Sequence, residues 1–178
     1  DIILNIFPQF KYYRRLEIIN NLNKNILDQF DAYLILALIV VDQSSDYEYF
    51  CHKYKTSNNI KERLKNISFN YEKINSKKFY SKLNIKKFIY FFKKKHVRDL
   101  LLFSVSLNKV DSLVVEKLLN YIDNCKVPKF PVSADYLKQL GFKEGPALGE
   151  KLRSLEEIWI KNNFVIEKKM VDKSLGKF

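Results

Sequence analysis

Apolar residues recur at helical spacing along most of the chain. Ile60, Leu64 and Ile67 follow one another at intervals of four and three residues, which places them on one face of a helix. The same pattern predicts helices over residues 28–41, 46–55, 57–67, 81–92, 97–107, 113–122, 135–140 and 146–160. Ser57 and Ser81 stand where N-cap residues are expected. Because the 178 residues include only four glycines and four prolines, the pattern predicts an all-α fold, a helical array.

Two prolines interrupt this helical pattern. Pro128 and Pro131 disfavour helix and favour an extended linker. Beyond them, Ser133 is placed to cap another helix. We therefore expect a larger helical body over residues 1–127 and a small helical tail over residues 128–178.

The longest apolar run, from Tyr33 to Val41, is nine residues long. A membrane-spanning helix needs about 20 residues, so the run predicts a buried core helix and no membrane partner. No signal-peptide pattern precedes it. Cys51 and Cys125 are too few for a disulfide framework and lack zinc-site spacing, which favours a reducing, cytoplasmic setting.

The net charge of +12 is concentrated in the middle of the chain. Residues 51–127 hold 18 basic and 6 acidic groups, a net +12, whereas residues 1–50 carry −3 and residues 128–178 carry +3. A regional excess of this kind indicates a surface that faces a polyanion such as a nucleic acid. A solubilising lysine face in a lysine-rich protein is the alternative interpretation.

The densest basic cluster is the hexapeptide from Lys93 to Arg98, which holds Lys93, Lys94, Lys95, His96 and Arg98. It falls where one predicted helix ends and the next begins. Cations at a helix C-terminus are locally favourable, but that explains only one or two of these charges. Contacts to backbone phosphates would explain all of them, without sequence readout.

Three of the four glycines lie within the nine residues from Gly141 to Gly149. The simplest geometry is a helix ended by Gly141, a tight turn, and a new helix with Pro146 at its first position. The N–H groups of Gly145, Ala147 and Leu148 would then be able to hold a phosphate. Lys143 and Lys151 would add charge, and the missing side chains of Gly145 and Gly149 would permit close approach. A turn whose glycines only let two helices pack is the alternative.

Catalytic patterns are absent from the sequence. It has no glycine-rich phosphate loop with a lysine, no His-Asp metal pair and only two histidines. Cys51 beside His52 is not a nucleophile–base pair on spacing alone, and Glu156-Glu157 fits a solvated helix face. We expect no catalytic residue and no metal site in this chain, which does not look like a self-sufficient enzyme.

The segment FPVSADYLKQLGFKEGPALGEKL, from Phe130 to Leu152, with Trp159 and Phe164 after it, resembles the C-terminal tail of bacterial class II tRNA nucleotidyltransferases, the family of CCA-adding enzymes and poly(A) polymerases. The similarity covers about 45 residues tightly. A looser similarity to the helical body of the family extends upstream through residues 98–102 and 58–64. Ala134 departs from the family, which often has Gly after this Ser.

The resemblance implies a catalytic head that binds Mg²⁺ and a neck that reads CTP and ATP, and the sequence contains the motifs of neither. What remains resembles the body and tail, the portion that holds the acceptor and T arms of tRNA during CCA addition. We therefore expect a tRNA-binding part of such an enzyme, with Lys93–Lys95, Arg98, Lys143, Gly145, Gly149 and Lys151 facing RNA. A subunit that docks a separately encoded head, or a non-catalytic remnant, are the alternatives.

Overall fold

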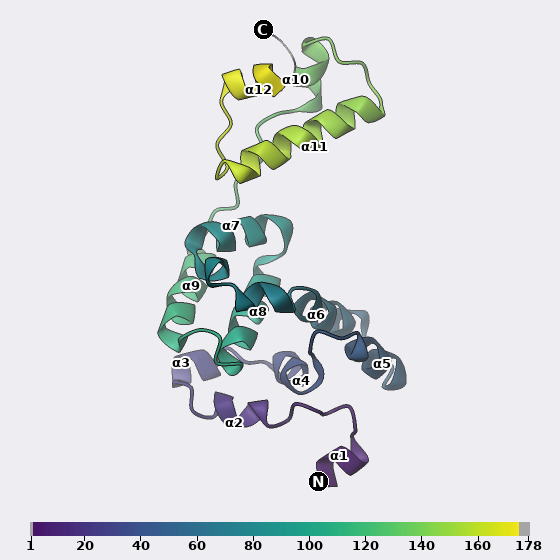
Figure 1. The fold of residues 1–178 in the computed structure, drawn as a ribbon, viewed down its shortest axis with the longest axis vertical. Helices are drawn as coiled ribbons and strands as arrows, with labels where there is room; N and C mark the ends of the chain where they lie inside the picture. The colour runs from purple at the N-terminus through teal and green to yellow at the C-terminus, as the bar shows by residue number, and fades with distance from the viewer. Residues whose placement is uncertain (1, 175–178) are drawn as a thin grey trace. The chain divides into compact units, whose positions relative to one another are not determined.

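The computed structural model describes residues 2–174, and this part of the chain contains twelve α-helices, two 3-10 helices and no strand (Figure 1). The all-α prediction is confirmed. The chain divides into two compact units, Asp1–Cys125 and Lys126–Phe178. No helix within residues 2–174 combines the length and the apolar character that crossing a membrane requires.

The first unit holds nine α-helices and both 3-10 helices. They are α1 (Ile2–Ile6), α2 (Arg15–Ile19), α3 (Lys24–Leu27), α4 (Ala32–Val40), α5 (Asp46–Lys53), α6 (Asn58–Phe69), η1 (Tyr71–Asn75), η2 (Lys77–Tyr80), α7 (Lys82–Phe91), α8 (Lys94–Ser106) and α9 (Ser112–Asn124).

Helix α8 is the centre of this unit. It contacts α2, α4, α6, α7, α9 and η1, and from Val97 onward every residue except Arg98 is buried. Beyond its first turn the helix has almost no exposed surface, so its sequence from Leu100 to Ser106 is a continuous apolar segment with two buried serines. Ser104 and Ser106 donate their hydroxyls to the carbonyls of Leu101 and Phe103, both at 2.6 Å, which satisfies the buried polar groups.

Side-chain caps fix where several helices begin. Ser57 and Ser81 accept hydrogen bonds from the amides of Ile60 and Asn84, as predicted from their positions. The single helix predicted over residues 28–41 is wrong in its first turn. The carboxylate of Asp31 accepts the amide of Leu34 at 2.9 Å, so α4 begins only at Ala32. The nine-residue apolar run forms the buried core helix that was predicted.

The second unit is built from α10 (Ala134–Gln139), α11 (Pro146–Lys161) and α12 (Lys168–Ser174). Leu137, Leu148, Leu155 and Val171 form its small buried core. Trp159 is buried and contacts Phe130 and Phe164, with ring centroids 5.4 and 5.0 Å apart. Ser133 caps α10 by accepting the amide of Tyr136 at 3.1 Å.

Candidate nucleic-acid interface

The basic cluster from Lys93 to Arg98 lies at the start of α8. Helix α7 ends at Phe91, Lys93 is the N-cap of α8, and Lys94 and Lys95 stand in its first turn, which has no acidic residue. A helix N-terminus carries partial positive charge, so cations there are unfavourable. The interpretation that these lysines stabilise the C-terminus of the preceding helix, α7, is therefore wrong, because α7 has no basic residue in its last turn. Lys94 instead reaches the last turn of α9. The positive charges of the lysine side chains and the positive end of the helix dipole therefore lie together at the N-terminus of α8.

The three lysines have different surroundings. Lys93 keeps 78% of its side chain exposed, with its Nζ 3.8 Å from Oε1 of Glu62, and Lys95 is exposed as well. Lys94 is half-buried and donates to the main-chain carbonyl of Asp123 at 3.0 Å. Lys93 and Lys95 therefore have the most freedom to reach a phosphate.

Arg98 makes contacts inside the unit. Its guanidinium donates to Oδ1 of Asp123 at 2.6 Å and to Oε1 of Gln29 at 2.6 Å, and a quarter of the side chain is exposed. These bonds join α8 to α9 and to the segment after α3. Arg98 thus stabilises the packing of the first unit, in addition to the phosphate contact predicted for it.

A buried ion pair fixes α6 against α8, the two helices that hold this surface. Arg63 on α6 donates from Nε and Nη2 to both carboxylate oxygens of Asp99 on α8, at 2.8 and 2.7 Å. Its Nη1 also donates to Asp31, the N-cap of α4, at 2.6 Å. Burial would raise the pKa of Asp31, but the hydrogen bonds from Arg63 and from the amide of Leu34 outweigh it and hold that pKa below its usual range. Three helices meet at this one guanidinium.

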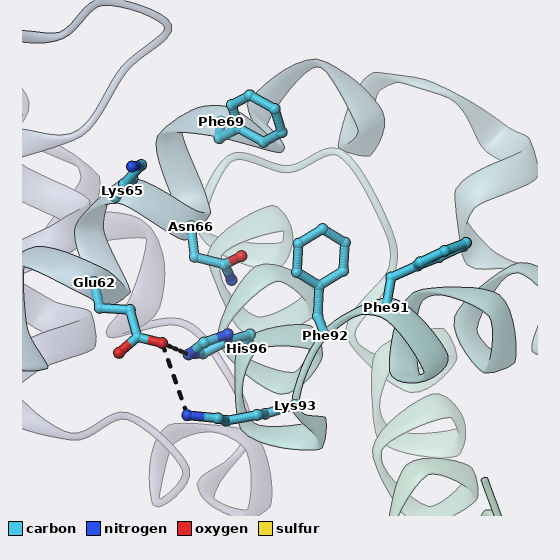
Figure 2. Close-up of a pocket in the computed structure, with 8 residues that line it drawn as sticks. All are labelled: Glu62, Lys65, Asn66, Phe69, Phe91, Phe92, Lys93 and His96. Atoms are coloured by element: carbon cyan, nitrogen blue, oxygen red, sulfur yellow. Dashed lines mark ion pairs between the residues drawn. The ribbon is translucent and has the colours of Figure 1, made fainter. Parts of the chain in front are cut away.

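A hollow of about 400 Å³ lies beside the cluster, between α6 and the junction of α7 with α8 (Figure 2). Its lining residues are Glu62, Lys65, Asn66, Phe69, Phe91, Phe92, Lys93 and His96. Sequence reasoning missed Phe69 and Phe91. The signal that could have found them is that neither residue falls on the apolar stripe of its own helix, which marks an exposed aromatic.

The glycine turn of the second unit has the predicted geometry. After α10, Gly141 takes a positive φ of 96°, its amide donates to Lys138, and the amide of Phe142 donates to Leu137. These two bonds form the Schellman motif that closes a helix on glycine. Gly145, with φ at 144°, is then the N-cap of α11, and Pro146 follows at its first position.

One part of the predicted phosphate cradle is wrong, and an ion pair that was not predicted lies beside it. The amide of Leu148 donates to the carbonyl of Gly145 at 3.1 Å, so the prediction that this N–H is open to a ligand is wrong. Lys138 is paired with Glu144 at 2.9 Å, which neutralises part of the turn and lowers the pKa of Glu144.

Close packing within the described residues does not explain why position 149 is a glycine. A Cβ atom at this position would lie within 4 Å of no heavy atom of residues 2–174 beyond its own helix backbone and chain neighbours. Gly149 is exposed in α11, as are Lys143 and Gly145 in the turn, and Lys151 is half-buried two residues further along. Packing of helices against Gly149 does not account for it.

The predicted site residues thus fall into two groups. Lys93, Lys94, Lys95 and Arg98 belong to the first unit, and Lys143, Gly145, Gly149 and Lys151 belong to the second. No family model matches this chain, and a search of the curated proteins found no relative.

Proposed function

We propose that this chain binds tRNA through the lysines at the start of α8, as the body and tail portion of a CCA-adding tRNA nucleotidyltransferase. The observation that supports it best is the position of Lys93, Lys94 and Lys95. They add their charges to the positive end of a helix that has no acidic residue in its first turn. Lys94 has a partner within the unit, the carbonyl of Asp123, but the dipole of α8 disfavours all three charges. A bound phosphate would relieve that repulsion.

The proposal divides the work between the two units. The lysines of the first unit contact phosphates of the tRNA, and the turn with Lys143, Gly145 and Gly149 contacts a further phosphate. In this proposal the addition of nucleotides is performed by a catalytic head and neck outside the described residues. Within residues 2–174, no three His, Cys, Asp or Glu side chains gather into a group that could hold a metal ion, so we assign no step to Mg²⁺ here.

The test is tRNA binding as a function of salt concentration. Replacing Lys93, Lys94 and Lys95 together by Ala should reduce the slope of log K against log salt by about 0.9 for each phosphate that is no longer neutralised, and so by at most about 2.7. The matched control replaces Lys53, Lys73 and Lys117, three exposed lysines spread over α5, η1 and α9. It removes the same charge and should change the slope far less. Equal effects of the two triple variants would remove the cluster from the interface.

A second candidate function is docking of a separately encoded protein chain. Helix α1 favours it, because Ile2 and Ile6 leave 77% and 62% of their surface exposed. An Ile2→Ser/Ile6→Ser variant should then lose co-purification with a head-bearing chain while keeping its affinity for tRNA. Loss of tRNA affinity in that variant would instead place α1 in the RNA interface.

A further inference from the structure

Two phenylalanines at the hollow beside the basic cluster stand largely in solvent. Phe69, the last residue of α6, is 79% exposed, and Phe91, the last residue of α7, is 63% exposed. The neighbouring Phe88 and Phe92 stack on each other at 5.7 Å and pack against the core. The core is therefore closed without Phe69 and Phe91, and their rings leave apolar surface in water that folding does not use.

The rings share the hollow with groups that favour an anion. Lys65, Lys93 and His96 line it, and Glu62 is the single acidic residue among its lining residues (Figure 2). Glu62 is itself 3.7 Å from Nε2 of His96 and 3.8 Å from Nζ of Lys93. The volume of about 400 Å³ falls at the lower end of the range for small-ligand sites.

We propose that this hollow is a stacking site for an unpaired nucleobase of a bound RNA strand. Single-stranded nucleic acid is held by aromatic rings that stack on bases and by cations that follow the backbone, and the hollow offers both. This inference rests on the proposed function, because it assumes that RNA reaches the start of α8.

The composition of the hollow favours a base over a protein side chain. Lysine and glutamate are depleted at the centres of protein–protein interfaces, yet Glu62, Lys65 and Lys93 line this hollow. A base also has polar edges that need partners. The carboxylate of Glu62 can accept from an exocyclic amine, and the amide of Asn66 can pair with a base edge. Asn70 donates to Oδ1 of Asn66 at 3.3 Å, which orients that amide.

The phosphates on either side of the base would meet the lysines. Lys65 on α6 and Lys93, the N-cap of α8, both line the hollow. The start of α8, with Lys94 and Lys95, continues the positive surface. One RNA strand would thus make both the phosphate contacts of the proposed function and the base contact in the hollow.

The experiment compares two RNAs on the full chain. One is a hairpin with a five-nucleotide single-stranded 3′ tail, and the other is the same hairpin with a blunt end. Phe69→Ala and Phe91→Ala should each weaken binding of the tailed hairpin by about tenfold to a hundredfold, the cost expected for removing one stacked base. Binding of the blunt hairpin should change less than twofold. The salt slope should stay the same, because no charge is removed.

Three controls make the result specific. Tyr49 on α5 is 61% exposed, so Tyr49→Ala removes an equally exposed ring away from the hollow and should leave both affinities unchanged. Phe69→Tyr and Phe91→Tyr keep a stacking ring and should keep the affinity. Circular dichroism of each variant verifies that the fold is intact.

Different failures have different meanings. If wild type binds tailed and blunt hairpins equally, with a steep salt slope that depends on the lysines, the stacking site is refuted and the proposed function stands. If neither RNA binds, the proposed function fails. If the Phe→Ala variants keep their RNA affinity but lose self-association or a protein partner, the hollow is a protein-docking site and our inference is overturned.

Discussion

The unit from Asp1 to Cys125 and the unit from Lys126 to Phe178 hold their helices in place by different means. In the first, α8 is surrounded by other helices, and a buried guanidinium joins α6, α8 and the cap of α4. In the second, a few buried side chains cover one another, and a turn with two positive-φ glycines sets the direction of α11. The first unit depends on tertiary contacts between distant residues, and the second depends on local backbone geometry.

This difference explains why one part of the candidate interface was predicted more completely from the sequence than the other. The turn from Gly141 to Gly149 is local, so residue types alone predicted its helix end and its helix start. The surface at the start of α8 depends on which helices lie beside it. Its lysines were found from sequence, whereas the exposed rings of Phe69 and Phe91 were not.

The largest expected effect comes from breaking the buried ion pair. Arg63→Ala leaves Asp99, with 7% of its side chain exposed, as a buried charge without its partner. We expect the free energy of unfolding of the first unit to fall by about 3–5 kcal/mol. Urea unfolding followed by far-UV circular dichroism measures this. Lys65→Ala, on the same helix and exposed, is the control and should change stability by less than about 0.5 kcal/mol.

The single Trp of the chain, Trp159, lies in the second unit, so its fluorescence separates the two units. In Arg63→Ala, the fluorescence transition should stay near its wild-type midpoint while the circular dichroism transition shifts. If both transitions move together, the units unfold as one, and the contrast drawn between them is wrong.

An intermediate effect is expected at the glycine turn. Gly145→Ala places a side chain at a φ of 144°, a conformation that costs about 1–3 kcal/mol for a residue other than glycine. The destabilisation should appear in the Trp159 fluorescence transition. Gly149→Ala is the matched control, because space around it is open. It should stabilise α11 by about 0.5–1 kcal/mol. A destabilising Gly149→Ala would show that something packs there.

The smallest effect concerns pH. The pKa of Asp31 is held below its ordinary value of 3.8, chiefly by Arg63 against the opposing effect of burial. The carboxylate therefore contributes stability that is present at neutral pH and is lost as pH falls through the lowered folded-state value. Asp31→Asn should remove part of this acid sensitivity, by less than about 1 kcal/mol because the side chain is 47% exposed. Unfolding by urea between pH 7 and pH 2.5 measures it, and an unchanged pH dependence would contradict the assignment.

The sequence by itself determined the helical class, most helix positions, the caps at Ser57, Ser81 and Ser133, and the turn at Gly141. Each of these depends on residues within a few positions of one another, through side-chain spacing, cap hydrogen bonds or allowed φ. The pattern did not predict the short helices α1, α2 and α3. It also placed the start of α4 too early, because the carboxylate of Asp31 accepts the amide of Leu34 and so caps the helix at that point.

Only the tertiary structure decided which charges are paired and which face solvent. Arg63 and Lys65 are two residues apart on α6, yet one is buried against Asp99 and the other lines an open hollow. Arg98 and Lys93 belong to one basic cluster, yet the first is bonded to Asp123 and the second stays exposed. These outcomes depend on partners 25 to 36 residues away in the chain. Helical spacing places a side chain on a face of its own helix, but the packing of other helices determines what that face meets.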